Sequence, residues 1–189
     1  MSTVLHTEVR RHRLTADDFR RMGEAGILRA DERVELIDGE VIDMAPIGSN
    51  HAGTVGFLAK RLERAVGDSA LVFVQNPLAL AAESEPQPDI MLLEPRADFY
   101  RSGHPRPEHV LLIVEVADTT LAYDRDIKMP LYARHGIPEA WLVDLENKRL
   151  HLFTSPSDTG YLESHSLARP AALCLVALTG SQVDVAGLF

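Results

Sequence analysis

The sequence is poor in cysteine and in aromatic residues, with one cysteine and 6% aromatic residues in a chain of 189 residues. A single cysteine excludes an internal disulfide and any zinc site built from several cysteines. The longest uninterrupted apolar run covers only residues 171–178, whereas a membrane-spanning helix needs ~20 apolar residues. The first thirteen residues, MSTVLHTEVRRHR, contain no apolar signal core. We therefore expect a soluble, cytoplasmic protein.

Positive charge is also scarce, since 19 Lys and Arg stand against 28 Asp and Glu, for a formal net charge of −9. An acidic chain repels nucleic-acid phosphates at long range. A nucleic-acid partner would therefore need a local basic patch or bound metal ions. The candidate patches are weak, and each could equally be a solvated surface: Lys60, Arg61 and Arg64, and the basic segment 10–13.

The length and the 46% hydrophobic content fit one globular domain, which we place at residues 14–189 after a flexible segment 1–13. Thr15 is expected to cap a first helix that ends near Gly23 or Gly26. Asp38-Gly39 lies between two apolar runs in 33–46, which predicts a tight β-hairpin. Ser49 or Asn50 would then cap a helix that runs to about Val66.

Further along the chain, short apolar runs predict strands at 71–75, 78–82, 89–93 and 109–116, with the last of these central in the sheet. A helix should follow at about Asp126 and end at Gly136, because Pro130 belongs in a first helical turn. Residues 140–153 form a hairpin around Glu146-Asn147. We expect Cys174 and Trp141 to be buried. This order predicts an α/β (α+β) domain with a mixed sheet flanked by helices.

Three carboxylates interrupt apolar segments, where an ionised group is costly unless it is paired, hydrogen-bonded or bound to a metal. Glu35 lies between Val34 and Leu36, Asp89 begins the strand 89–93, and Glu115 lies near the end of the most apolar strand. Each has a structural alternative, because Glu35 can point to solvent, Asp89 can be a turn residue, and Glu115 can bind nearby backbone.

Taken together, the carboxylates suggest more specific chemistry. Asp89 and Glu115 lie on strands that could be neighbours, and two converging carboxylates suit a hard cation such as Mg²⁺. Lys128 could stabilise negative charge beside such a metal, with Tyr132 four residues further on the same helical face. The alternative for Lys128 is a surface ion pair with Asp124. Three clustered carboxylates should also raise at least one pKa in the metal-free protein.

The order of several short motifs resembles the Uma2 (DUF820) family of the PD-(D/E)XK nuclease superfamily. These motifs are VELIDGEVIDMAP, Asn50-His51, QPD at 87–89, VEV at 114–116, Lys128 with Tyr132, and GIPEAWLVD at 136–144. The resemblance implies a restriction-endonuclease-like fold and a Mg²⁺- or Mn²⁺-dependent endonuclease acting on nucleic acid, with DNA as the expected partner.

The resemblance also implies site residues. Asp89 and Glu115 match the metal ligands, with the backbone carbonyl of Val116 as a further ligand. Glu35 and Lys128 match catalytic positions, and Gln87 and Tyr132 match accessory positions. His51 could lie near the phosphate, although we favour a structural position for it, as a cap or packed against the sheet.

The chain departs from the family pattern in the stretch Ala117-Asp118-Thr119-Thr120, and Pro130 lies between Lys128 and Tyr132. An alternative function is therefore a non-catalytic nuclease-fold protein that binds a partner or oligomerises. We expect a homodimer, since duplex cleavage needs one site for each strand and the runs 140–153 and 171–178 are strongly apolar. The alternative is that both runs are the protein's own core.

Overall fold

The computed structural model describes residues 11–29 and 31–189, and its largest element is a six-stranded mixed sheet. The strand order is β3-β4-β5-β6-β7-β8, in which only β5 and β6 are parallel. The strands are β3 (Leu71–Val74), β4 (Ile90–Leu93), β5 (Val110–Ala117), β6 (Glu139–Asp144), β7 (Arg149–Ser157) and β8 (Gly160–Leu167). The predicted α/β class with helices flanking a mixed sheet is confirmed, and β5 is central as expected.

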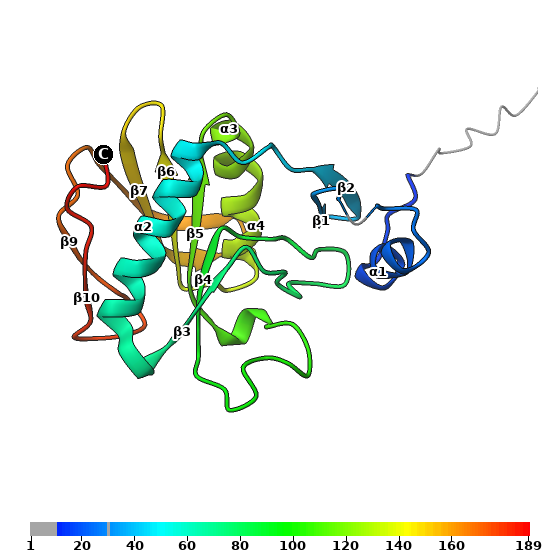
Figure 1. Cartoon of the computed structure of the whole chain (residues 1–189), viewed down its shortest axis with the longest axis horizontal. Coiled ribbons are helices and arrows are strands. Elements are labelled where there is room, and N and C mark those ends of the chain that lie inside the picture. Colours follow the sequence, from blue (N-terminus) through cyan, green and yellow to red (C-terminus); the bar gives the residue numbers. More distant parts are fainter. Residues whose placement is uncertain (1–10, 30) are drawn as a thin grey trace, which may run out of the picture.

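Helices cover both faces of this sheet (Figure 1). One face packs Ile90, Val114 and Trp141 against α2 (Ser49–Val66), whose buried positions follow helical spacing. The other face packs against the helical segment α3 (Leu121–Tyr123), η3 (Asp124–Lys128) and α4 (Met129–Arg134). Trp141 is fully buried, as the sequence predicted. None of the helices among the described residues combines the length and apolar character required to cross a bilayer.

A smaller lobe lies beside the sheet and consists of α1 (Ala16–Glu24) and the hairpin of β1 (Val34–Ile37) and β2 (Glu40–Asp43) (Figure 1). Thr15 caps α1 as predicted, in a reciprocal capping box with Asp18. Asp38 and Gly39 both have positive φ, which confirms the tight turn.

The lobe is attached to the sheet body through the loop that precedes β4. The backbone N–H of Leu36 and the carbonyl of Glu85 are hydrogen-bonded, as are the N–H of Glu85 and the carbonyl of Leu36. The N–H of Gly39 donates to the carbonyl of Glu83, and the N–H of Ala16 donates to that of Ala82. These bonds fix the hairpin and the start of α1 to residues 82–85 of this loop.

The helical segment after β5 begins earlier than Asp126, the predicted earliest start, and a π-helical turn follows its first turn. Helical backbone starts at Leu121, and the Met129 N–H donates to the carbonyl of Asp124, five residues back. The wider turn places Pro130 at the start of α4, where its missing N–H and its ring are tolerated. Gly136, with φ of 75°, follows the helix end as expected.

Three further expectations about local structure are wrong. Residues 78–82 form no strand but a loop with one isolated bridge, since Leu78 and Leu80 are buried there individually. Gly48, not Ser49 or Asn50, is the N-cap of α2, and no side chain caps this helix. Cys174 is exposed because it lies on β9 (Ala172–Cys174), which pairs with β10 (Gln182–Asp184) outside the main sheet.

The predicted flexible segment 1–13 lies almost entirely outside the described residues. Of its described part, Arg11 pairs with Glu40 at 3.6 Å and Arg13 with Glu83 at 3.8 Å. Arg10 of the basic segment 10–13 lies outside the described residues. The described arginines of this segment thus already face carboxylates.

Candidate active site

Asp89 and Glu115 lie on the same face of the sheet because of the register between β4 and β5. Ile90 pairs with Val114 in this antiparallel ladder, so Asp89 falls opposite Glu115. Residues opposite each other in such a pair have Cβ atoms about 4.5–5.5 Å apart. The Asp89 N–H also lies 3.4 Å from Glu115 Oε2. The two carboxylates that the sequence singled out are therefore neighbours.

The Asp89 carboxylate accepts three hydrogen bonds from different elements. Val116 N–H donates at 2.9 Å, His51 Nε2 at 3.1 Å and the Gln75 side-chain amide at 3.2 Å. Burial opposes the charge of Asp89, but these donors, led by His51, hold its pKa below the ordinary value. The same hydrogen bond raises the pKa of His51. Asp89 is thus kept ionised and fixed in orientation.

Lys128 lies between two buried carboxylates that come from distant parts of the chain. Its Nζ is 2.7 Å from Glu115 Oε1 and 3.2 Å from Glu35 Oε2. The Tyr132 hydroxyl donates to Glu115 Oε1 at 2.5 Å, and the Gln87 N–H donates to Glu35 Oε2 at 3.0 Å. All three side chains of this triad (Glu35, Glu115 and Lys128) are at most 5% exposed.

Burial and pairing set the ionisation of this triad. Complete burial raises the pKa of Glu115 to about 8, because desolvation outweighs the attraction of Lys128. Burial opposes the charge of Lys128 as well, but Glu115 and Glu35 together raise its pKa above the ordinary value. The raised pKa of Glu115 agrees with the expectation from the clustered carboxylates.

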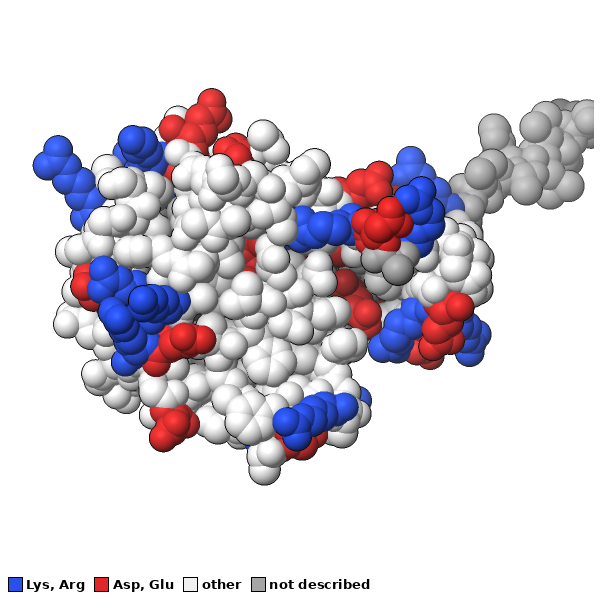
Figure 2. All heavy atoms as spheres, in the orientation of Figure 1, with Lys and Arg blue, Asp and Glu red and all other residues white. Residues whose placement is uncertain are grey.

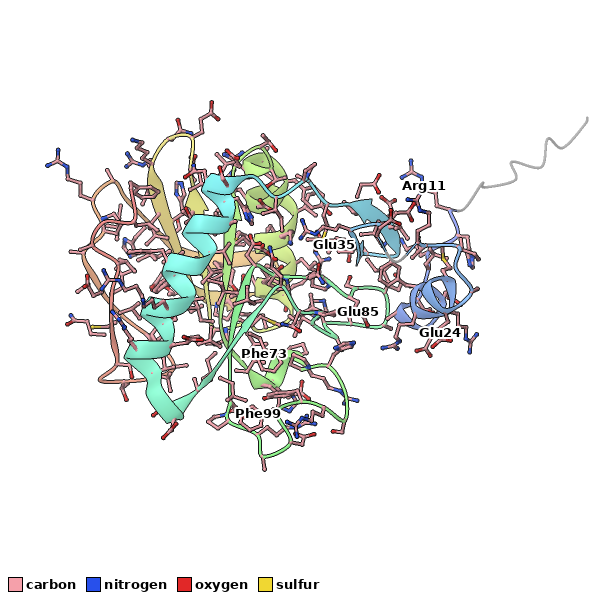
Figure 3. The ribbon with its side chains drawn as sticks, viewed as in Figure 1. Arg11, Glu24, Glu35, Phe73, Glu85 and Phe99 are labelled. Carbon is pink, nitrogen blue, oxygen red and sulfur yellow. The ribbon has the colours of Figure 1, made fainter. Side chains whose placement is uncertain are left out.

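These residues line one cleft of about 440 Å³ between the lobe and the sheet body. Six carboxylates line it, against one lysine and one arginine: Glu35, Asp43, Asp89, Glu115, Asp118 and Asp124, with Lys128 and Arg33. Carboxylates lie recessed at this junction in Figure 2. In Figure 3, Glu35 is on the side of the hairpin facing the sheet, whereas Arg11 and Glu24 are at the far side of the lobe.

The accessory residues predicted from the sequence contact the carboxylates of this cleft. Gln87 and Tyr132 contact the triad, and His51 binds Asp89; His51 does not cap α2, since Gly48 is the N-cap, and its role at the site stays a prediction. The alternative surface pair of Lys128 with Asp124 is wrong, because Asp124 accepts a hydrogen bond from Thr120 instead.

The basic residues of α2 do not reach the cleft. Lys60 is eleven residues beyond Ser49, a separation of about 16 Å along a helix. Arg61 pairs with Asp184 at 2.9 Å and lies over the Phe57 ring. Arg64 does not line the cleft either. The weak nucleic-acid contacts proposed for these three residues therefore lie away from the carboxylates.

Several cleft residues were missed from the sequence. Tyr123 ends α3 and Asp124 begins the π-helical turn, and both line the cleft, whereas Gln75 follows β3 with φ of 53° and reaches the site through its hydrogen bond to Asp89. Burial raises the pKa of Asp124, and it raises that of Tyr123 to about 12. The i,i+4 spacing of Thr120 and Asp124 was the available signal for the first of these. Gln75 carries no such signal, because its position depends on a backbone conformation that glutamine rarely adopts.

The donor set of the cleft fits a hard divalent cation. Two neighbouring carboxylates and a backbone carbonyl are oxygen ligands of the kind that Mg²⁺ takes, with substrate oxygens and water completing the shell. The excess of carboxylates also leaves the cleft strongly negative. Within the described part of the chain, however, no three His, Cys, Asp or Glu side chains converge as a ready metal cluster.

A mixed sheet with this carboxylate–lysine site at the junction of β4, β5 and the following helix defines the class, a restriction-endonuclease-like nuclease fold. The chain belongs to the Uma2 family, described as "Putative restriction endonuclease", whose model matches residues 16–186. Family and fold together support a nuclease-type hydrolase.

One relative in sequence and one solved structure are similar to this chain. The chain is 30% identical over 165 residues to "Uncharacterized protein sll1609" from Synechocystis sp. (strain ATCC 27184 / PCC 6803 / Kazusa), covering 85% of this chain and 91% of that protein. It also matches the crystal structure of "a putative nuclease belonging to DUF820" from Anabaena variabilis ATCC 29413 with a TM-score of 0.66. That match covers 86% of this chain and 89% of the other at 17% identity, and so supports the fold.

Proposed function

We propose that the protein is a Mg²⁺- or Mn²⁺-dependent endonuclease that hydrolyses phosphodiester bonds of nucleic acid, with DNA as substrate. The supporting observation is the pair Asp89 and Glu115, opposite each other on one sheet face, with Lys128 Nζ 2.7 Å from Glu115. The strongly negative cleft supports a cation there, because phosphate would otherwise be repelled.

The side chains of Asp89 and Glu115 and the carbonyl of Val116 would hold the metal. Once bound, a divalent cation supplies Lewis acidity and makes water more acidic. Lys128 brings a buried positive charge to the point where negative charge develops on the attacking water. Glu35 positions Lys128 from the other side, and Tyr132 fixes Glu115. His51 and Gln75 orient Asp89.

The test is cleavage of plasmid DNA and of a single-stranded oligonucleotide, each with Mg²⁺, with Mn²⁺ and with a chelator. The variants are Asp89→Asn and Lys128→Met, and the matched control is Glu63→Gln, an exposed carboxylate on α2 outside the cleft. We expect metal-dependent cleavage that the two site variants reduce at least a hundredfold and the control leaves unchanged, as for other positioned catalytic groups, which contribute about 10²–10⁴-fold. Equal activity of all four proteins, or none in the wild type, would refute the proposal.

The alternative is a non-catalytic protein with the same fold, and one observation favours it. Glu115 Oε1 is already bound by Lys128 and Tyr132, and the described residues form no ready cluster of three ligands. Calorimetric titration with Mn²⁺ separates the two functions. A catalytic site binds the metal and loses it in Asp89→Asn, whereas a pure scaffold binds none in either protein.

The homodimer expected from the sequence belongs to this proposal, although part of its basis is wrong. The run 140–153 is core, because β6 is buried throughout between β5 and β7. The two edge strands of the sheet are β3 and β8, and β8 carries the more exposed apolar side chain, Leu162 at 72%. The cytoplasmic location stays a prediction.

A further inference from the structure

Among the described residues, Arg33 is the one arginine that lines the cleft, and it is not used by the triad. Its Nη1 donates to the carbonyl of Ala45 at 3.2 Å, which ties the guanidinium to the segment after β2. No carboxylate among the described residues lies within 4.0 Å of it, in contrast to Arg11, Arg13 and Arg20 of the same lobe. An arginine held at the wall of an acidic cleft without a carboxylate partner retains its capacity to bind an anion.

The segment beside Arg33 brings apolar side chains to the cleft, with Asp43 as its one carboxylate. We call these side chains the apolar strip, which consists of Ile42, Met44, Pro46 and Ile47. Ile47 is one of the few large apolar side chains among the described residues that are strongly exposed, at 42%. The strip lines the same cleft as the carboxylates and offers a surface for a flat or aliphatic group.

An anion-binding side chain next to an apolar surface matches the two parts of one nucleotide. We propose that the cleft binds an unpaired nucleic-acid strand, with Arg33 on a backbone phosphate next to the one attacked, and the apolar strip against a base or sugar. This inference rests on the proposed function, because it names the substrate class of the same site.

Two properties of the cleft favour an unpaired strand over a duplex. Its volume of about 440 Å³ is that of a pocket for a small ligand, which matches one or two nucleotides. Apolar surfaces contact base faces only when the bases are unstacked, as in single strands. A guanidinium also binds phosphate oxygens in a bidentate manner, which fixes the strand beside Asp89 and Glu115.

The test measures binding by fluorescence anisotropy, with a labelled oligothymidylate as probe and Ca²⁺ as a cation with oxygen ligands. Arg33→Gln is compared with Arg29→Gln, which removes an equal charge from the same lobe, at a residue that pairs with Asp31 outside the cleft. Ile47→Ser is compared with Ile27→Ser, since Ile27 is 65% exposed and also outside the cleft. Every sample is run on a gel to record cleavage separately, and circular dichroism confirms that each variant is folded.

We expect Arg33→Gln to weaken binding about tenfold, as for the loss of a charge-assisted hydrogen bond. Loss of one phosphate contact on a single strand should also reduce the slope of log K against log salt concentration by about 0.7. Ile47→Ser should weaken binding severalfold without changing this slope. Both controls should bind like the wild type, and the matching duplex should bind more weakly than the single strand.

Equal effects of Arg33→Gln and Arg29→Gln, an unchanged salt slope in Arg33→Gln, or tighter binding of the duplex would each overturn the inference. Equal effects of Ile47→Ser and Ile27→Ser would overturn it as well, because the apolar strip would then make no contact. Binding with these differences but without cleavage in Mg²⁺ would refute only the proposed nuclease activity. Cleavage without any effect of Arg33→Gln would refute only this inference.

Discussion

Replacing Lys128 by methionine should destabilise the protein in a strongly pH-dependent way. Lys128 Nζ lies 2.7 Å from Glu115 and 3.2 Å from Glu35, and the three side chains are at most 5% exposed. At an effective dielectric constant of about 20, the gross attractions are about 6 and about 5 kcal/mol. Desolvation and repulsion between the carboxylates offset part of this, and removing one partner of a buried ion pair typically costs about 3–5 kcal/mol. We expect a loss of that size at pH 9.

The sign of the pH dependence follows from the proton count. Without Lys128, the folded variant retains the proton on Glu115 up to higher pH than the wild type, because the attraction that opposes desolvation is lost, so its stability falls more steeply as pH rises. The raised pKa of Lys128 keeps this lysine charged over the whole range in the wild type. Near pH 5 the wild type buries a lysine beside protonated Glu115, so the loss in the variant should be small or reversed.

Urea denaturation at pH 5, 7 and 9 measures this effect. Lys60→Met is the matched control, since Lys60 is exposed on α2, and it should change stability by less than about 0.5 kcal/mol. The double variant with Glu115→Gln should recover part of the loss at pH 9, because a neutral amide replaces the unpaired carboxylate. If Lys128→Met lowers the free energy of unfolding by less than about 1 kcal/mol at pH 9, or by the same amount at all three pH values, Lys128 does not stabilise the buried carboxylates.

Four further outcomes are expected. Mg²⁺ or Mn²⁺ at ten times its dissociation constant should raise the melting temperature by about 3–6 °C in the wild type and not in Asp89→Asn, as scanning calorimetry would show. The raised pKa of Glu115 means that wild-type stability should fall as pH rises from 4.5 to about 8, and Glu115→Gln should flatten this fall in urea titrations; an unchanged slope would contradict the assignment. Gly39→Ala should destabilise the protein by about 1–3 kcal/mol, because Gly39 has φ of 77° and an added Cβ would lie 2.5 Å from Arg13 Cβ, whereas Gly53→Ala on α2, with open space around it, should not. Light scattering should give twice the chain mass of 20.9 kDa, and the monomer mass at micromolar concentration would exclude the homodimer.

Features fixed by neighbouring residues could be predicted from the sequence. Asp38-Gly39 identified the hairpin because its turn requires two residues that tolerate positive φ, and Thr15 identified the helix start because its side chain caps a nearby N–H. The sequence also suggested that Asp89 and Glu115 are close, because they lie on two apolar strands that could be neighbours, and the two strands do pair.

Features that depend on distant contacts could not be predicted. Pro130 suggested a late helix start, but the π-helical turn accommodates it and brings Lys128 into the core. Burial of Lys128 depends on Glu35, which belongs to another lobe. His51 has no local pattern that separates a cap from a partner of Asp89, and Cys174 is exposed because its strand pairs outside the main sheet. In each case the deciding neighbour lies far away in the sequence.

The ion pair between Lys128 and Glu35 joins the β1–β2 hairpin to the helical segment after β5. The strands β3, β4 and β5 lie between these two residues in the sequence. During synthesis, Glu35 leaves the ribosome first, then Asp89 and Glu115, and only afterwards the lysine that neutralises them. A nascent chain that ends before residue 128 therefore lacks the positive charge that Lys128 places between Glu35 and Glu115. The same late residue thus completes the buried triad and adds a side-chain contact between the lobe and the helical segment after β5.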